Sequence, residues 1–130
     1  MIEHLTANIS AKTAAIGVIG LGYVGLPVAC MLANSGFQVT GIDIDAERIA
    51  TINRGETPIG GEEPGIADLI ASVVGAGRLH ATTDYAALRA VQVIIICVDT
   101  PVDEGTHLPS YRALRAVLAQ LRGVLAAGAL

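Results

Sequence analysis

The stretch I-G-V-I-G-L-G-Y-V-G-L-P, residues Ile16–Pro27, decides the fold that this sequence predicts. It joins a short, continuous apolar run, Ala14–Gly20, to a helical pattern of apolar residues over Tyr23–Ser35. An apolar run of strand length is typical of a strand that is covered on both faces, as in a parallel sheet. Residues 20–25 read G-x-G-x-x-G between the two patterns. The sequence therefore predicts a strand, a tight glycine turn and a helix in direct succession.

Each glycine of this turn has a physical role in holding a diphosphate. Gly20 permits the tight turn off the strand, Gly22 lets a diphosphate approach the backbone, and Gly25 lets the helix pack close to the sheet. The free N–H groups and the partial positive charge at the helix N-terminus favour phosphate. These residues predict a phosphate-binding loop.

A second feature, the acidic residue Asp43, points to a dinucleotide. It ends a predicted strand, Phe37–Ile44, roughly 20 residues beyond the loop, where an acid accepts hydrogen bonds from the adenosine ribose hydroxyls. The negative charge of Asp43 would repel the 2′-phosphate of NADP, and the next residue, Ile44, is not a basic residue that could bind this phosphate. NAD is therefore the expected cofactor. Arg48 lies one helical turn further on, where it can stack near the adenine or neutralise Asp43.

The remaining segments alternate between helix and strand. They are a helix Ala46–Asn53, a glycine- and proline-rich loop over 54–65, a helix from Ile66, a strand Arg78–Thr82, a short helix from Thr83 to Arg89, the most apolar strand, Val91–Val98, a loop to Pro109, and a final helix capped by Ser110. This order predicts an α/β fold with a Rossmann-like, doubly wound parallel sheet. Residues 1–13 carry no pattern and are expected to be a flexible tail, so the domain is expected over 14–130.

Composition excludes several classes of protein. A chain of 130 residues that is 52% apolar and 15% charged fits one folded domain rather than a disordered chain. The net charge is −4 and lysines and arginines do not cluster, so we expect no nucleic-acid partner. The residues from Ala14 to Phe37 carry no charge, but Pro27 and several glycines interrupt the run, so we expect no membrane span.

The two cysteines point to no metal site. Cys30 and Cys97 lie in apolar runs, form no C-x-x-C pair and have no histidine at ligand spacing. We expect buried, free thiols in a reducing, cytoplasmic compartment.

Five motifs together resemble the UDP-glucose/GDP-mannose dehydrogenase family. They are the glycine stretch quoted above, G-I-D-I-D-A-E-R-I at Gly41–Ile49, Glu63-Pro64-Gly65 before a helix, T-T-D-Y at Thr82–Tyr85, and C-V-D-T-P-V-D-E at Cys97–Glu104. The resemblance extends over Ala14–Ala127. Members of this family oxidise the C6 alcohol of a nucleotide-linked sugar to a carboxylate with two NAD molecules, through a thiohemiacetal on a catalytic cysteine.

The resemblance also implies which residues contact NAD. The pyrophosphate would meet Gly20, Gly22, Tyr23, Val24 and Gly25, the adenosine ribose would meet Asp43 and Arg48, and the nicotinamide side would be lined by Val98, Thr100 and Pro101. Asp99 stands where many members of the family carry proline, which places a charge beside Thr100 in this chain. The form G-L-G-Y-V-G-L-P favours members that act on UDP-N-acetylmannosamine, and UDP-glucose and GDP-mannose stay open.

The family's catalytic cysteine and its sugar-nucleotide domain lie beyond the first 130 residues, and neither Cys30 nor Cys97 matches the nucleophile's motif. The resemblance thus implies a cofactor-binding portion without turnover of its own, with the sheet truncated after its fourth strand and the helix that follows. The outer edge of Val91–Val98 then lacks a partner, so we expect self-association, and a homo-oligomer in the full-length enzyme. The alternatives are a non-catalytic NAD-binding module, a β-hydroxyacid dehydrogenase cofactor domain, and the front of a flavoprotein.

Overall fold

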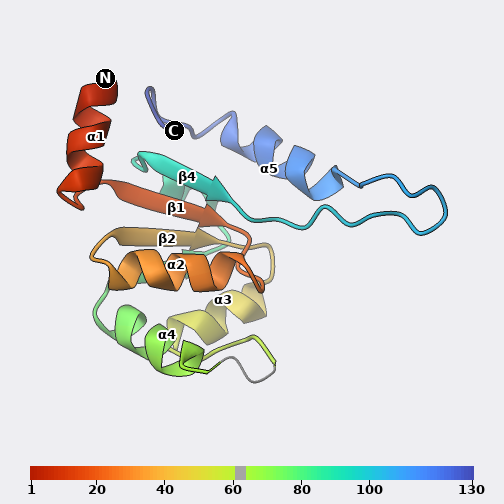
Figure 1. Ribbon diagram of the computed structural model, residues 1–130, viewed down its shortest axis with the longest axis horizontal. Helices are drawn as coiled ribbons and strands as arrows, with labels where there is room; N and C mark the ends of the chain where they lie inside the picture. The colour runs from red at the N-terminus through yellow and green to blue at the C-terminus, as the bar shows by residue number, and fades with distance from the viewer. Residues whose placement is uncertain (61–63) are drawn as a thin grey trace.

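A four-stranded parallel sheet forms the centre of the protein (Figure 1). The computed structural model describes residues 1–60 and 64–130. The strands are β1 (Ala15–Ile19), β2 (Gln38–Ile42), β3 (Leu79–Thr82) and β4 (Val93–Ile96), in the order β3-β2-β1-β4. The chain moves outward from β1 to β3 and then crosses back to β4, so the strand order reverses between β1 and β4. This topology confirms the predicted doubly wound α/β fold.

Helices cover both faces of the sheet. The helical segments are α1 (Ile2–Ser10), α2 (Gly25–Asn34), α3 (Ala46–Asn53), α4 (Ile66–Gly75), the 3₁₀ turn η1 (Tyr85–Leu88) and α5 (Arg112–Leu121). In Figure 1, α2, α3 and α4 lie below β1 and α5 lies above β4. Among residues 1–60 and 64–130, none of these helices is long and apolar enough to cross a membrane.

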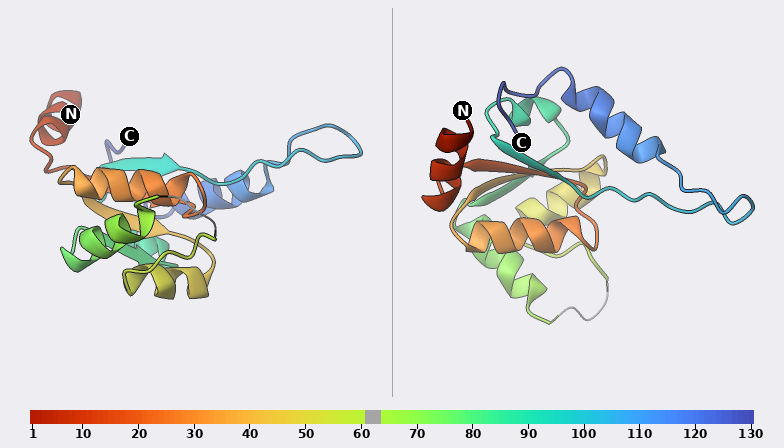
Figure 2. Two further views of the ribbon diagram at one scale, coloured as in Figure 1. Left: turned by 60° about the horizontal axis from the view of Figure 1, so that its bottom comes forward. Right: turned by 45° about the horizontal axis from the view of Figure 1, so that its top comes forward.

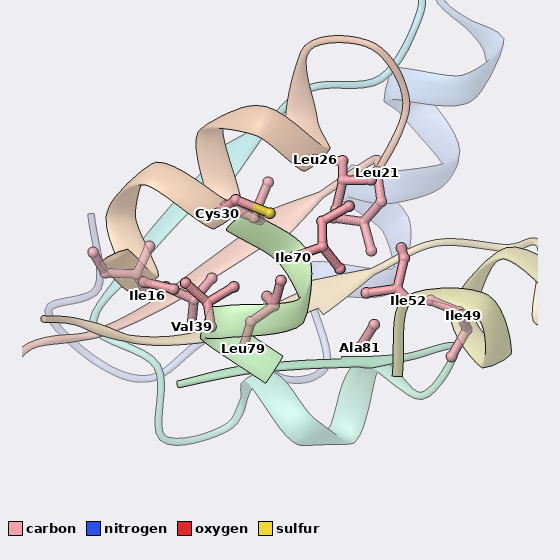
Figure 3. Close-up of a cluster of buried hydrophobic side chains, with 14 of the residues drawn as sticks. Ile16, Leu21, Leu26, Cys30, Val39, Ile49, Ile52, Ile70, Leu79 and Ala81 are labelled. Atoms are coloured by element: carbon pink, nitrogen blue, oxygen red, sulfur yellow. The ribbon is translucent and has the colours of Figure 1, made fainter. Parts of the chain in front are cut away.

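The larger hydrophobic core lies between the sheet and helices α2, α3 and α4 (Figure 3). Helix α2 turns Leu26, Ala29, Cys30 and Ala33 inward, at the spacing of one helical face. Across from it, β1 and β2 contribute side chains that include the buried Val18. Full burial of each large aliphatic side chain contributes about 1.5–3 kcal/mol, so this cluster fixes the position of α2 on the sheet.

The second core, on the opposite face, is smaller. Its buried members are Ile19, Ile42, Leu88 and Val91, together with Val117 and Leu121 from α5. The neighbouring residues Leu118 and Leu125 are 51% and 50% exposed. Helix α5 is therefore held on the sheet by a narrow contact.

Two local features differ in detail from the expected pattern. Residues 1–13 include helix α1, none of whose residues is buried, and a flexible tail at 1–13 stays a prediction. Ser110 does not cap the final helix, which begins at Arg112 after Tyr111 and has no side-chain cap. The Ser110 N–H donates to the Pro101 carbonyl at 2.7 Å, which holds Ser110 in the preceding hairpin, one residue before the cap position at Tyr111.

The two edges of the sheet are closed differently. On the β4 side, Leu130 pairs with the strand edge: the Ile94 N–H donates to the Leu130 carbonyl at 2.8 Å, and the Leu130 N–H donates to the Gln92 carbonyl at 2.9 Å. On the β3 side, the Asn53 side-chain amide donates to the Ala81 carbonyl at 2.8 Å and accepts from the Ala81 N–H at 2.9 Å. Asn53 thus takes the place of a neighbouring strand.

We predict that Asn53→Ala lowers the free energy of unfolding by about 1–3 kcal/mol, because two part-buried hydrogen bonds to the edge of β3 are lost. Urea denaturation followed by circular dichroism measures the change. The matched control is Asn34→Ala at the exposed end of α2, which we expect to change stability by less than about 0.5 kcal/mol. Equal effects of the two substitutions would contradict the role of Asn53.

Candidate functional site

The glycine turn lies at the carboxyl end of β1 and rests on β4. Gly20 has a φ of +93°, a conformation that favours glycine. A Cβ on Gly20 would also lie 2.6 Å from the carbonyl oxygen of Cys97 and 3.1 Å from the backbone nitrogen of Val98. Residue 20 must therefore be glycine both for its backbone angle and for its contact with β4.

The other two glycines differ sharply in their surroundings. A Cβ on Gly25 would collide with the carbonyl oxygen of Gly20 and lie 3.1 Å from the Cβ of Cys97, so the first turn of α2 packs directly on the strand end. A Cβ on Gly22 would have only the Arg48 Nη1 atom nearby, at 3.9 Å. The turn is thus filled beneath Gly25 and open beside Gly22, the side from which a diphosphate can approach.

The N-terminus of α2 is available to an anion. The helix begins at Gly25, two residues later than predicted, and neither a side-chain cap nor an acidic residue occupies its first turn. Tyr23 and Val24 precede it and are 74% and 65% exposed. Uncapped N–H groups at a helix N-terminus, with the positive end of the helix dipole, favour phosphate.

The peptide groups of Leu21 are held from both sides by residues of β2 and α3. The Leu21 N–H donates to Asp43 Oδ2 at 2.9 Å, and Arg48 Nη1 donates to the Leu21 carbonyl at 2.9 Å. The Leu21 side chain is fully buried, and a Cβ on Gly41 would lie 2.8 Å from its Cδ1 atom. We call this arrangement of Leu21, Asp43 and Arg48 the Leu21 clasp; it brings together residues that the sequence analysis assigned to the ribose.

Asp43 keeps acceptor capacity within the clasp. Its Oδ1 atom accepts from the Asp45 N–H at 3.0 Å, so each carboxylate oxygen has one backbone partner. A carboxylate offers about four lone-pair sites, which leaves room for two ribose hydroxyls. Among the described residues Asp43 and Arg48 form no ion pair, so Arg48 acts on the Leu21 carbonyl rather than neutralising Asp43 directly.

Helix α3 fixes the position of Arg48. Asp45 caps this helix by accepting from the N–H groups of Glu47 and Arg48 at 3.0 and 3.1 Å. The cap sets the first turn of the helix, and Arg48 projects from that turn to Leu21. Sequence spacing placed Arg48 near the site but carried no signal for its partner.

An open hollow of about 490 Å³ is lined by Ile44, the residue that follows Asp43 in the chain. Its other lining residues include Asp84, Tyr85, Arg89 and Gln120. None of its lining residues was assigned to the site from the sequence. Burial and, to a lesser extent, the charge of Asp43 raise the pKa of Tyr85. The Tyr85 hydroxyl therefore stays protonated at neutral pH and can donate a hydrogen bond.

The three residues expected at the nicotinamide side are not equally close to the turn. Val98 is half-buried and lies beside Gly20, whereas Thr100 and Pro101 are exposed on the segment 99–111, which leads away from the sheet. Contact of these three residues with the nicotinamide stays a prediction.

The cysteines differ in burial. Cys30 is free and lies in the larger core, where burial raises its pKa to about 11. Cys97 is free and half-buried, and burial raises its pKa as well. Both are thiols rather than thiolates at neutral pH, so neither is activated as a nucleophile.

Comparison with known proteins decides which dinucleotide-binding family this is. Residues 14–130 match the UDP-glucose/GDP-mannose dehydrogenase family, NAD binding domain. The chain belongs to this family. Membership confirms the resemblance read from the motifs and favours it over the flavoprotein and β-hydroxyacid dehydrogenase alternatives.

Individual relatives agree with this assignment. The chain is 44% identical over 94 residues to GDP-mannose 6-dehydrogenase of Pseudomonas syringae pv. syringae, a match that covers 72% of this chain and 21% of the relative. It is 43% identical over 90 residues to UDP-N-acetyl-D-mannosamine dehydrogenase of Methanococcus maripaludis, covering 69% of this chain and 20% of the relative. The chain thus spans about a fifth of the length of these curated relatives.

Solved structures show the same fold. UDP-D-ManNAc dehydrogenase from Pyrococcus horikoshii superposes with a TM-score of 0.82 at 39% identity, over 89% of this chain and 27% of that chain. A ternary complex of GDP-mannose dehydrogenase from Pseudomonas aeruginosa gives 0.77 at 34% identity, over 82% and 24%.

The glycine geometry yields a stability prediction. Gly25→Ala forces a methyl group against the Gly20 carbonyl and should lower the free energy of unfolding by about 1–3 kcal/mol or more. Gly22→Ala places the same methyl group in open space and should change it by less than about 0.5 kcal/mol. Urea denaturation of both variants measures the difference, and equal destabilisation would refute the described packing of the turn.

The segment beyond Thr100 yields a pH prediction. Hydrogen bonds from Thr106, through its backbone and its hydroxyl, and from the Gly105 backbone lower the pKa of Asp103. The order that these bonds give to the turn is therefore present above the ordinary Asp pKa of about 3.9 and is lost as pH falls through the lower, folded value. Amide NMR signals of Gly105 and Thr106 should shift in that acidic window. In Asp103→Asn these signals should not titrate there; if they do, another group controls the turn.

Proposed function

We propose that this chain is the NAD-holding part of a dehydrogenase that oxidises the C6 alcohol of a UDP-sugar, UDP-N-acetylmannosamine or UDP-glucose, to the carboxylate with two NAD molecules. The observation that supports it is the Leu21 clasp beside an open Gly22. The clasp orders the turn before any ligand arrives, and it leaves the acid of the clasp with acceptor capacity at the place where a ribose is expected.

The residues divide the dinucleotide between them. The diphosphate lies over Gly22 and receives hydrogen bonds from backbone N–H groups at the start of α2. The adenosine ribose donates its hydroxyls to Asp43, and the adenine enters the hollow beside Ile44. The nicotinamide extends toward Val98, and there NAD supplies the hydride acceptor of the reaction. Asp43 disfavours NADP, because a 2′-phosphate would bring like charge against its carboxylate.

A nucleotide-sugar substrate is supported by the names of the relatives, GDP-mannose 6-dehydrogenase and UDP-N-acetyl-D-mannosamine dehydrogenase. The UDP-sugar within that class is supported by the second name and by the motif G-L-G-Y-V-G-L-P. Within this chain no cysteine suits the thiohemiacetal step, because burial keeps both thiols protonated. The 130-residue chain is therefore expected to bind NAD without oxidising a nucleotide sugar, which residues outside this chain would bind. We also propose that the enzyme is a homo-oligomer that works in the cytoplasm.

Calorimetric titration with NAD tests the role of Asp43. Asp43→Ala should weaken binding by one to two powers of ten, since a hydrogen bond to a charged acceptor contributes about 1.5–3 kcal/mol. NADP should bind the unmodified chain more weakly than NAD does.

The matched control is Glu47→Ala, which removes a neighbouring, exposed acid of α3 but neither the Asp45 cap nor a proposed ribose contact. It should change stability by less than about 1 kcal/mol and leave NAD affinity near its original value. Unchanged affinity in Asp43→Ala, or equal losses in both variants, would contradict the proposed ribose contact.

A further inference from the structure

The segment 99–111, which we call the arm, projects from the body of the protein (Figures 1 and 2). It is an ordered hairpin: Val102 pairs with Pro109, and the Asp103 carboxylate accepts from the backbone of Gly105 and Thr106 at its tip. Yet every residue from 99 to 113 is exposed. The arm carries apolar side chains into solvent, with Val102 59% and Leu108 64% exposed.

Helix α5, which follows the arm, also presents an unpartnered face. Arg115, Leu118, Arg122 and Leu125 follow each other at spacings of three, four and three residues, which places them on one side of the helix and its extension. Leu118 and Leu125 are 51% and 50% exposed, while Val117 and Leu121 on the adjoining face of the helix are buried. We call this outward set the α5 stripe.

Charge is segregated between the two surfaces. The arm contains Asp99, Asp103 and Glu104 and no lysine or arginine, whereas the residues after Glu104 contain Arg112, Arg115 and Arg122 and no acid. Among residues 1–60 and 64–130, none of these six side chains forms an ion pair, since the ion pair present is Arg54 with Glu56. An acidic, partly apolar hairpin and a basic, partly apolar helix face are complementary to each other.

We propose that two copies of this chain associate by laying the arm of each along the α5 stripe of the other. A two-fold arrangement makes both contacts at once, because each copy carries both surfaces. Opposite charges set the register, while Val102 and Leu108 of one copy cover apolar stripe residues such as Leu118 of the other. The interface uses no residue of the glycine turn or of the Leu21 clasp. The arm also carries Thr100 and Pro101, which the proposed function places at the nicotinamide, but the proposed dimer rests on the charges and apolar side chains of the arm and α5 rather than on NAD binding.

The test is a charge exchange followed by analytical ultracentrifugation over a concentration series. One variant carries Arg115→Glu and Arg122→Glu, and the other carries Asp99→Lys and Glu104→Lys; Asp103 is kept because it holds the tip of the arm. Each variant alone sets like charges against each other at both contacts, so its dimer should be at least about tenfold weaker. An equimolar mixture restores opposite charges at both contacts and should form a heterodimer of near-original affinity.

Two controls keep the result interpretable. The double variant Lys12→Glu and Arg54→Glu makes the same change in net charge as the Arg115→Glu and Arg122→Glu variant, but away from the arm and the α5 stripe. It should leave dimerisation unchanged. The second control is the salt dependence of the unmodified chain. Its dimer should weaken as the salt concentration rises, because salt screens exposed charges. A monomer at all concentrations, single variants that associate like the unmodified chain, or a mixture that fails to associate would each overturn the proposal.

Discussion

The peptide groups flanking Leu21 are the point on which the site depends. A glycine turn has few side chains to hold it, so its shape must be fixed by neighbours. The Asp43 carboxylate accepts a hydrogen bond from the Leu21 N–H, and the Arg48 guanidinium donates one to the Leu21 carbonyl. The Leu21 side chain is buried against Gly41. One residue thus anchors the turn to β2 and α3 at once. The acid therefore contributes to the order of the turn as well as to the proposed ribose contact.

Because Asp43 both orders the turn and is the proposed ribose contact, the NAD affinity of an Asp43 variant reflects two effects. Removing a carboxylate from the clasp leaves the Leu21 N–H without its partner, and an unsatisfied donor costs about 1–3 kcal/mol when it is buried. Loss of NAD affinity in such a variant combines a missing ribose contact with a less ordered turn. A change in the free energy of unfolding reports the second contribution alone, so the two can be separated.

The fold could be predicted because its signals are local. The apolar run of β1, the glycine pattern and the periodicity of α3 each follow from backbone sterics or from one buried face, and α3 begins and ends where predicted. The missed features depend on tertiary placement. The hydrogen bonds from Asn53 to Ala81 and from Arg48 to Leu21 form only when the strands and helices have packed together. No spacing in the sequence therefore predicts these two contacts. Serine is a favoured helix cap, but the tertiary fold places Ser110 in the hairpin of the arm and Tyr111 at the cap position.

The shape of the glycine turn also depends on strand β4. Gly20 packs against the carbonyl of Cys97, at the end of β4, so the turn keeps its shape only while β4 stays beside β1. That strand is the most apolar of the four, yet Ile94 and Ile96 on the α5 side are only half-buried, because α5 covers this face through few residues. Packing that adds to the second core therefore stabilises the platform under Gly20. On the other side β3, closed by Asn53, lies two strands away from the turn, so disturbance there reaches the turn only through β2.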